Sequence, residues 1–183
     1  TAELADGRIT TVVYHAMAGG GCVAMHEDVT ARVRAQRELE HTRAFLGTVI
    51  ENVPSPIIVK NPDTLTYLLI NRAAENYFGV DRSTILGKTV RDVMPQSSAD
   101  FIETEDRRAI AAGQPIFADE HAIMTPGNGM RVAIATRLPV MGADGKPQYL
   151  ISLISDVTER KRQEERLAHM AHHDALTGLP NRA

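Results

Sequence analysis

Residues 155–160 read SDVTER and join a β-rich run to a densely charged segment. Asp156 precedes Glu159 by three residues, which is the spacing of a capping box, so we expect a strand to end here and a helix to begin over residues 159–173. Residues 27–32 read EDVTAR, 128 residues earlier, and a second charged, helix-like segment follows them. An internal repeat of this kind indicates two copies of one structural unit.

One complete domain is predicted between the two repeats, over residues 54–158. Gly- and Pro-rich turns separate short β-rich runs from helical patterns, and Asn71 is placed to cap the first short helix. Two strands, short helices and three strands in this order predict an α+β fold, a five-stranded antiparallel sheet with helices on one face. The expected strands are 56–60, 65–70, 115–124, 130–141 and 148–155. The expected helices are a short one at 72–78 and a longer one at 96–112.

Several spaced motifs within this domain point to one family. They read NRAA at 71–74, LGK at 86–88, LPV at 138–140 and DGKP at 144–147, and the domain ends in DVT at 156–158. The pattern resembles the PAS sensory domains over residues 54–158. The resemblance implies a PAS fold with a space between its sheet and its helices.

The segments before this domain are interpreted as parts of the same kind of module. Residues 1–30 resemble the last hairpin of a preceding PAS domain, and residues 31–53 read as an input linker helix. Leu39, Leu46 and Val53 recur every seven residues. This spacing is typical of a coiled-coil seam or of one face of an amphipathic helix, and it predicts a homodimer formed through the linker helices.

Residues 174–182 read DALTGLPNR. This segment resembles the opening of the GGDEF family, the diguanylate cyclases, so residues 174–183 are interpreted as the start of such a domain. The Gly-Gly-Asp-Glu-Phe sequence that names the family does not occur in the 183 residues, so no catalytic residue is assigned. The residues predicted to pass a signal to the cyclase are Asp156, Thr158, Glu159, Asp174, Gly178 and Asn181.

Composition limits the possible partners and compartment. The net charge of −3 argues against nucleic acid, which a basic surface would attract. A single cysteine, Cys22, fits a reducing compartment, and no apolar run approaches the ~20 residues of a membrane span. We therefore expect a cytoplasmic protein whose sequence shown here makes no direct membrane contact.

A ligand pocket is possible inside the domain. Residues 54–158 contain no cysteine, which argues against the covalent flavin that the family resemblance would allow, and residues 96–113 contain no histidine for haem. No spacing suggests a metal site, so no cofactor is predicted. Arg131 and Arg137 could meet an anionic ligand, although pairing with Asp119 and Glu120 or solvation is favoured. The residues expected to line a pocket, or to fill a plain core, are Val59, Leu69, Phe78, Ile102, Ile116, Ile134 and Leu153.

The favoured hypothesis is a non-catalytic PAS module that senses a signal and regulates a diguanylate cyclase through the output helix. One alternative is a sensor of an unknown small ligand in the same class of protein. Another is the PAS module of a histidine-kinase-type sensor, although His173 and Asp174 run into a helix stop, which argues against phosphotransfer. A catalytic fragment is disfavoured because no nucleophile–base pair is evident.

Overall fold

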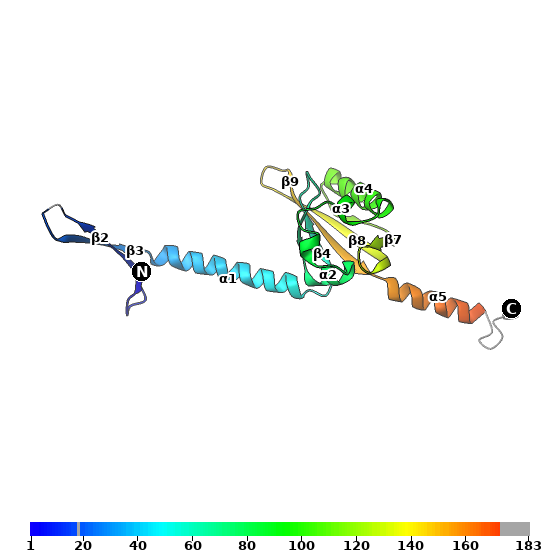
Figure 1. Cartoon of the computed structure of the whole chain (residues 1–183), viewed down its shortest axis with the longest axis horizontal. Coiled ribbons are helices and arrows are strands. Elements are labelled where there is room, and N and C mark those ends of the chain that lie inside the picture. Colours follow the sequence, from blue (N-terminus) through cyan, green and yellow to red (C-terminus); the bar gives the residue numbers. More distant parts are fainter. Residues whose placement is uncertain (18, 173–183) are drawn as a thin grey trace. The chain divides into compact units, whose positions relative to one another are not determined.

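The computed structural model describes residues 1–17 and 19–172, with side chains up to Leu167 (Figure 1). The chain forms two compact units, the first of residues 1–49 and the second beginning at Ile50. Helix α1 (Thr30–Asn52) begins in the first unit and has its last turn in the second. Its bounds agree with the predicted linker helix to within one residue.

The first unit is a small antiparallel sheet followed by most of α1. Strand β2 (Ile9–Ala16) pairs with both β1 (Ala2–Glu3) and β3 (Cys22–Asp28), which gives the predicted hairpin and one additional short strand. Every residue of β3 is exposed. Among the described residues of this unit, only Ile9 and Val29 are buried. The unit therefore has almost no core, and a hairpin of this kind is marginally stable alone.

The second unit is built on one antiparallel sheet with the strand order β5-β4-β9-β8, to whose last strand both β6 and β7 pair. This confirms the predicted α+β fold. The strands are β4 (Ile57–Lys60), β5 (Tyr67–Ile70), β6 (Ile116–Phe117), β7 (His121–Thr125), β8 (Gly129–Met141) and β9 (Pro147–Asp156).

Short helices follow β5, and α3 and α4 lie on one side of the sheet in Figure 1. Asn71 caps α2, as predicted, because its side chain accepts a hydrogen bond from the amide of Ala74. Gly79 and Gly113 end α2 and α4 in the left-handed conformation that favours glycine. The helical segments are α2 (Arg72–Phe78), the 3₁₀ turn η1 (Arg82–Thr84), α3 (Val90–Val93), α4 (Gln96–Ala112) and α5 (Thr158–His172).

The strand predicted over residues 115–124 forms two pieces, β6 and β7, so the edge of the sheet differs from the prediction. Phe117 pairs with Thr136, and His121 pairs with Ala133. These two pairs are four residues apart along the edge but three residues apart along β8. The additional residue lies between the two pieces, where residues 118–120 belong to neither strand.

The core lies between the helices and one face of the sheet. It contains the large apolar side chains Tyr67, Ile70, Phe78, Ile85, Val90 and Ile154. The opposite face of the sheet is also partly apolar but is more open, with Leu69, Tyr149 and Leu153 exposed.

The β7–β8 turn closes one end of this core against α2. The Asn128 side chain donates hydrogen bonds to the carbonyls of Asn76 and Tyr77 at 2.6 and 3.2 Å, and the Gly127 amide donates to the carbonyl of Phe78 at 2.8 Å. A Cβ atom at Gly127 would meet the backbone of Gly79, so glycine is required for this close approach.

Candidate functional site

A cavity lies between the sheet and the helices of the second unit. Its volume is about 30 Å³, which corresponds to one or two water molecules. Strands from across the sheet form one wall, and α2 and α4 contribute the other. The polar residues that line it are Lys60, Tyr67, Asp106, His121, Arg137 and Ser152.

The pocket residues predicted from sequence divide between the two faces of the sheet. Phe78 and Ile102 line the cavity. Ile116 is half-buried in β6 and does not line it. The other four were assigned to the wrong face, because their neighbours in β4, β5, β8 and β9 point inward instead. These four are Val59, Leu69, Ile134 and Leu153.

The wrong assignment has a physical cause. Both faces of the sheet carry apolar residues, so alternation alone does not tell which face is buried. The inward face also carries Lys60 and Arg137, side chains that rarely enter a core unless they are paired.

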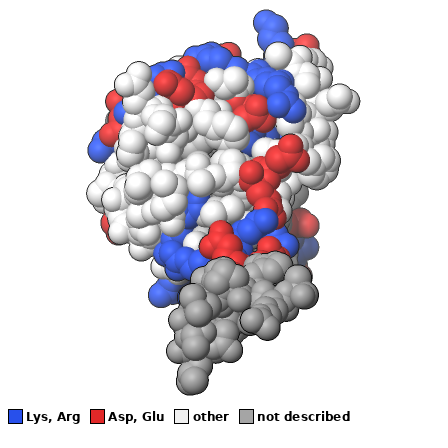
Figure 2. Space-filling view, turned by 90° about the vertical axis from the view of Figure 1, so that its right-hand side faces the viewer, with Lys and Arg blue, Asp and Glu red and all other residues white. Residues whose placement is uncertain are grey.

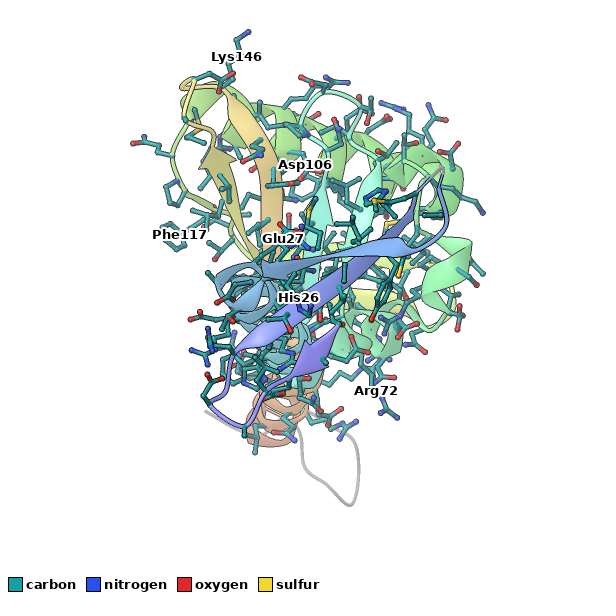
Figure 3. All side chains as sticks on the ribbon, turned by 90° about the vertical axis from the view of Figure 1, so that its left-hand side faces the viewer. His26, Glu27, Arg72, Asp106, Phe117 and Lys146 are labelled. Carbon is teal, nitrogen blue, oxygen red and sulfur yellow. The ribbon has the colours of Figure 1, made fainter. Side chains whose placement is uncertain are left out.

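Asp106 is the common partner of Lys60 and Arg137. It lies in the interior of the domain, whereas Phe117 and Lys146 lie at its periphery (Figure 3). The Lys60 Nζ is 2.6 Å from Oδ2 of Asp106, and the Arg137 Nε is 2.7 Å from Oδ1. All three side chains are at most 3% exposed. Burial alone would lower the pKa of Lys60, but the Asp106 carboxylate beside its ammonium group raises that pKa, so the lysine is charged.

The two arginines of β8 have partners other than those predicted. Arg137 was expected to be solvated or paired with Asp119 or Glu120, and it is instead buried against Asp106. Arg131 lies 3.5 Å from Asp156 at the end of β9. Glu120 pairs with Arg160 and Lys161 of α5 and not with either arginine of β8.

The joint between β9 and α5, which we call the second joint, consists of Asp156, Val157 and Thr158. The Asp156 Oδ1 accepts hydrogen bonds from the amide and the hydroxyl of Thr158 at 2.9 and 2.5 Å. The Thr158 Oγ1 accepts from the amide of Val132 in β8 at 2.9 Å, and the amide of Val157 donates to the Val132 carbonyl at 2.9 Å. The start of α5 is therefore hydrogen-bonded to β8 of the sheet.

The capping box predicted at this joint does not form. Glu159 makes contacts along α5, with Gln163 and Arg166, and not with the backbone of Asp156. Thr158 ties down the beginning of the helix in its place. A second contact comes from Glu120, which pairs with Arg160 and Lys161, and these cations lower the pKa of the Glu120 carboxyl.

The first joint, Asp28 to Thr30, repeats this geometry between β3 and α1. The Asp28 Oδ1 accepts from the amide and hydroxyl of Thr30 at 3.0 and 2.5 Å. The Thr30 Oγ1 accepts from the amide of Ile9 at 2.8 Å, and the Val29 amide donates to the Ile9 carbonyl at 2.8 Å. The sequence repeat is thus a repeat of four hydrogen bonds.

Asn71 anchors the other end of the domain, a role that sequence reasoning missed. Its fully buried side chain accepts from the amides of Ile57 and Ala74 and donates to the carbonyls of Ile50, Val53 and Ser55. The last turn of α1 is therefore held by the residue that caps α2. The location of Asn71 between a strand and a helix signals the cap but not the other contacts.

Three of the predicted signal-transfer residues, Asp174, Gly178 and Asn181, lie outside the described residues. Within 1–17 and 19–172, no cluster of three or more potential metal ligands occurs. No helix in that part of the chain is long and apolar enough to cross a membrane. On the face drawn in Figure 2, Lys and Arg are interspersed with Asp and Glu and form no continuous basic surface.

Comparison with known proteins decides the family. Residues 50–162 match the family described as the PAS fold. The chain belongs to the PAS-fold family. The PAS domain of BvgS from Bordetella pertussis superimposes with a TM-score of 0.54 and 24% identity, over 72% of this chain and 97% of that domain. The second unit is therefore a PAS sensory module.

Two curated relatives from Escherichia coli K12 concern cyclic di-GMP. The cyclic di-GMP phosphodiesterase PdeR is 27% identical over 147 residues, which cover 80% of this PAS chain and 22% of PdeR. The diguanylate cyclase DgcM is 58% identical over 35 residues, 19% of this chain and 8% of DgcM.

The virulence sensor protein BvgS of Bordetella pertussis is also similar in sequence, at 27% identity over 157 residues, 84% of this chain and 12% of BvgS. The chain spans less than a quarter of the length of each of these relatives.

Proposed function

We propose that this PAS module senses a signal and, through α5, sets the activity of a diguanylate cyclase domain that follows it in the same protein. The observation that carries the proposal is the second joint, in which Thr158 at the start of α5 is hydrogen-bonded to Val132 in the sheet. The module itself performs no chemistry in this proposal, because its task is to position the output helix.

The cavity and the output helix meet at one edge of the sheet. Val132 bonds Thr158, and its neighbour Ala133 lines the cavity. On the adjacent strand His121 lines the cavity, while Glu120 beside it pairs with Arg160 and Lys161. A change in the shape of the cavity would therefore displace the backbone segments that hold α5.

Cyclic di-GMP as the output is supported by sequence. The short but high identity to DgcM and the longer match to PdeR both involve enzymes of cyclic di-GMP turnover. Residues 174–182, which resemble the opening of the GGDEF family, begin two residues after the last residue of α5, His172. In this proposal Asp174, Gly178 and Asn181 receive the movement of the helix.

We further propose that two chains pair through their linker helices. No residue of α1 is fully buried, and the large apolar side chains Leu39, Phe45, Leu46 and Val49 are exposed along it. A second copy of the helix would cover this surface. Sedimentation of the protein should give a dimer that Leu46→Glu weakens, whereas a monomer at high concentration would contradict dimerisation.

The proposed module works in the cytoplasm without haem or covalently bound flavin. A cavity of about 30 Å³ supports this part of the proposal, since either cofactor is many times larger. A small ligand remains compatible with it.

Similarity to the virulence sensor BvgS supports a second candidate, in which the module belongs to a histidine-kinase-type sensor. The two candidates differ in the nucleotide that the whole protein uses. Purified full-length protein incubated with GTP should release cyclic di-GMP. Autophosphorylation with ATP and no product from GTP would favour the second candidate instead.

A further inference from the structure

The buried group of Lys60, Asp106 and Arg137 carries more positive than negative charge. Asp106 is the sole carboxylate among the residues lining the cavity, and both of its oxygens are already engaged by the two cations. Arginine remains protonated in proteins. Burial raises the pKa of Tyr67, whose phenol therefore stays neutral at neutral pH and adds no negative charge.

The excess charge has an identifiable location. The Nη1 atom of Arg137 is buried and has no hydrogen-bond partner among the described residues, although Nε of the same guanidinium is paired. Arg137 and Lys60 both line the cavity. An uncompensated cation in a protein interior is unfavourable, so this arrangement favours an additional negative group.

We propose that the cavity binds a small monovalent anion, a halide or a short carboxylate, on the guanidinium of Arg137. The inference goes beyond the proposed function because it names a ligand class and would hold whatever the output domain is. One net positive charge fits one negative charge. The apolar remainder of the lining, including Phe78, Ile123 and Ile154, disfavours a second charge on the ligand.

The size of the cavity restricts the anion further. About 30 Å³ accommodates chloride or formate, whereas acetate would require the flexible Met94 side chain to move. A water molecule in the cavity would leave the charge uncompensated. Water and anion therefore predict different responses to added salt.

The test is the urea unfolding of the protein at constant ionic strength, with sodium formate compared with sodium gluconate. Gluconate has the same charge but is too large for the cavity. We expect the unfolding midpoint to rise with the logarithm of the formate concentration and to be unaffected by gluconate. Saturation-transfer NMR from the protein methyl groups to formate reads binding directly.

Variants assign the effect to the site. Arg137→Gln leaves the neutral Lys60–Asp106 pair and should abolish the formate response, whereas the exposed Arg107→Gln should retain it. If Arg137→Gln fails to fold, Lys60→Met, which leaves the Arg137–Asp106 pair, should also lose the response. Equal midpoints in formate and gluconate, or an equal formate response in the cavity and control variants, would overturn the proposal and leave water as the occupant.

Discussion

The two joints of this chain have the same hydrogen bonds but lie on very different sheets. At each joint an aspartate accepts from the amide and hydroxyl of a threonine, and the threonine oxygen accepts from a strand amide. The unit that contains the first joint has two buried residues among those that the structure describes, whereas the sheet beneath the second joint is covered by a helical layer and a core.

The second joint also has ion pairs, whereas the described residues around the first joint form none with Asp28, on which Arg8 and Arg34 act without direct pairing. Arg131 lies beside Asp156, and Glu120 pairs with the first turn of α5. The comparison shows that three residues suffice to fix the local geometry of a strand-to-helix joint. In the proposed function a change passes through the second joint because its sheet, unlike that of the first joint, rests on a packed interior.

The largest effect should come from removing the charge at the centre of that interior. Asp106→Asn leaves Lys60 and Arg137 buried without their carboxylate and should lower the free energy of unfolding of the second unit by about 3–5 kcal/mol. Urea denaturation measures this, with hydrogen exchange at both joints. The amides of the second joint should lose protection while those of the first keep theirs.

The exposed Asp100, which pairs with Arg91, provides the matched control. Asp100→Asn should change the free energy of unfolding by about 1 kcal/mol or less. Similar losses in the two variants would show that the buried pairs do not stabilise the second sheet more than a surface pair does.

A smaller effect is expected when the threonine of each joint is changed. Thr158→Val leaves the Val132 amide without its acceptor and should lower the free energy of unfolding by about 1–3 kcal/mol. Thr30→Val likewise leaves the Ile9 amide without its acceptor, but it should not alter the cooperative unfolding of the second unit. Exchange rates of these two amides check the pair, and a cooperative loss in Thr30→Val would contradict the separation of the units.

Tyr77 allows a finer comparison on the second unit. Its hydroxyl is buried without a partner among the described residues, and burial raises the pKa of the phenol. Tyr77→Phe should therefore leave the free energy of unfolding unchanged or increase it by up to about 1 kcal/mol. The exposed Tyr149, changed to Phe, is the control, and a clear loss of stability in Tyr77→Phe alone would reveal a hydrogen bond at that hydroxyl.

The smallest effect should be a pH dependence of the ion pairs at the second joint. Because Lys161 and Arg160 lower the pKa of Glu120 in the folded protein, their pairing stabilises α5 above the ordinary pKa of glutamate and is lost as pH falls through the lowered value. Amide protection in the first turn of α5 should decline below about pH 4. Glu120→Gln should remove this dependence, and an unchanged pH profile in that variant would assign it to another group.

Local sequence predicted the elements of the PAS domain well. Helix α4 was predicted at its observed bounds, because Gly113 ends it, and Asn71 and Gly79 identified both ends of α2. These signals depend on backbone conformation and capping within a few residues. The repeat of Asp, Val and Thr indicated two copies of one structural unit, and the two joints have the same pattern of hydrogen bonds.

The cavity could not be predicted in the same way. Lys60 and Arg137 point inward because Asp106, 46 and 31 residues away, neutralises part of their charge. A pattern of apolar alternation assigns charged residues to solvent, so it placed Val59 and Ile134 inside instead. The role of Thr158 at the start of α5 could not be predicted for a similar reason, because Thr158 bonds to Val132, which lies on another strand.

The most direct test of the account is the rate of cyclic di-GMP formation from GTP by the full-length protein, measured for wild type, Thr158→Val and Thr30→Val. Hydrogen exchange would first confirm that the second unit is folded in each. The account predicts a changed rate in Thr158→Val and a rate near that of wild type in Thr30→Val. Equal rates in wild type and Thr158→Val would contradict the claim that this joint sets the output.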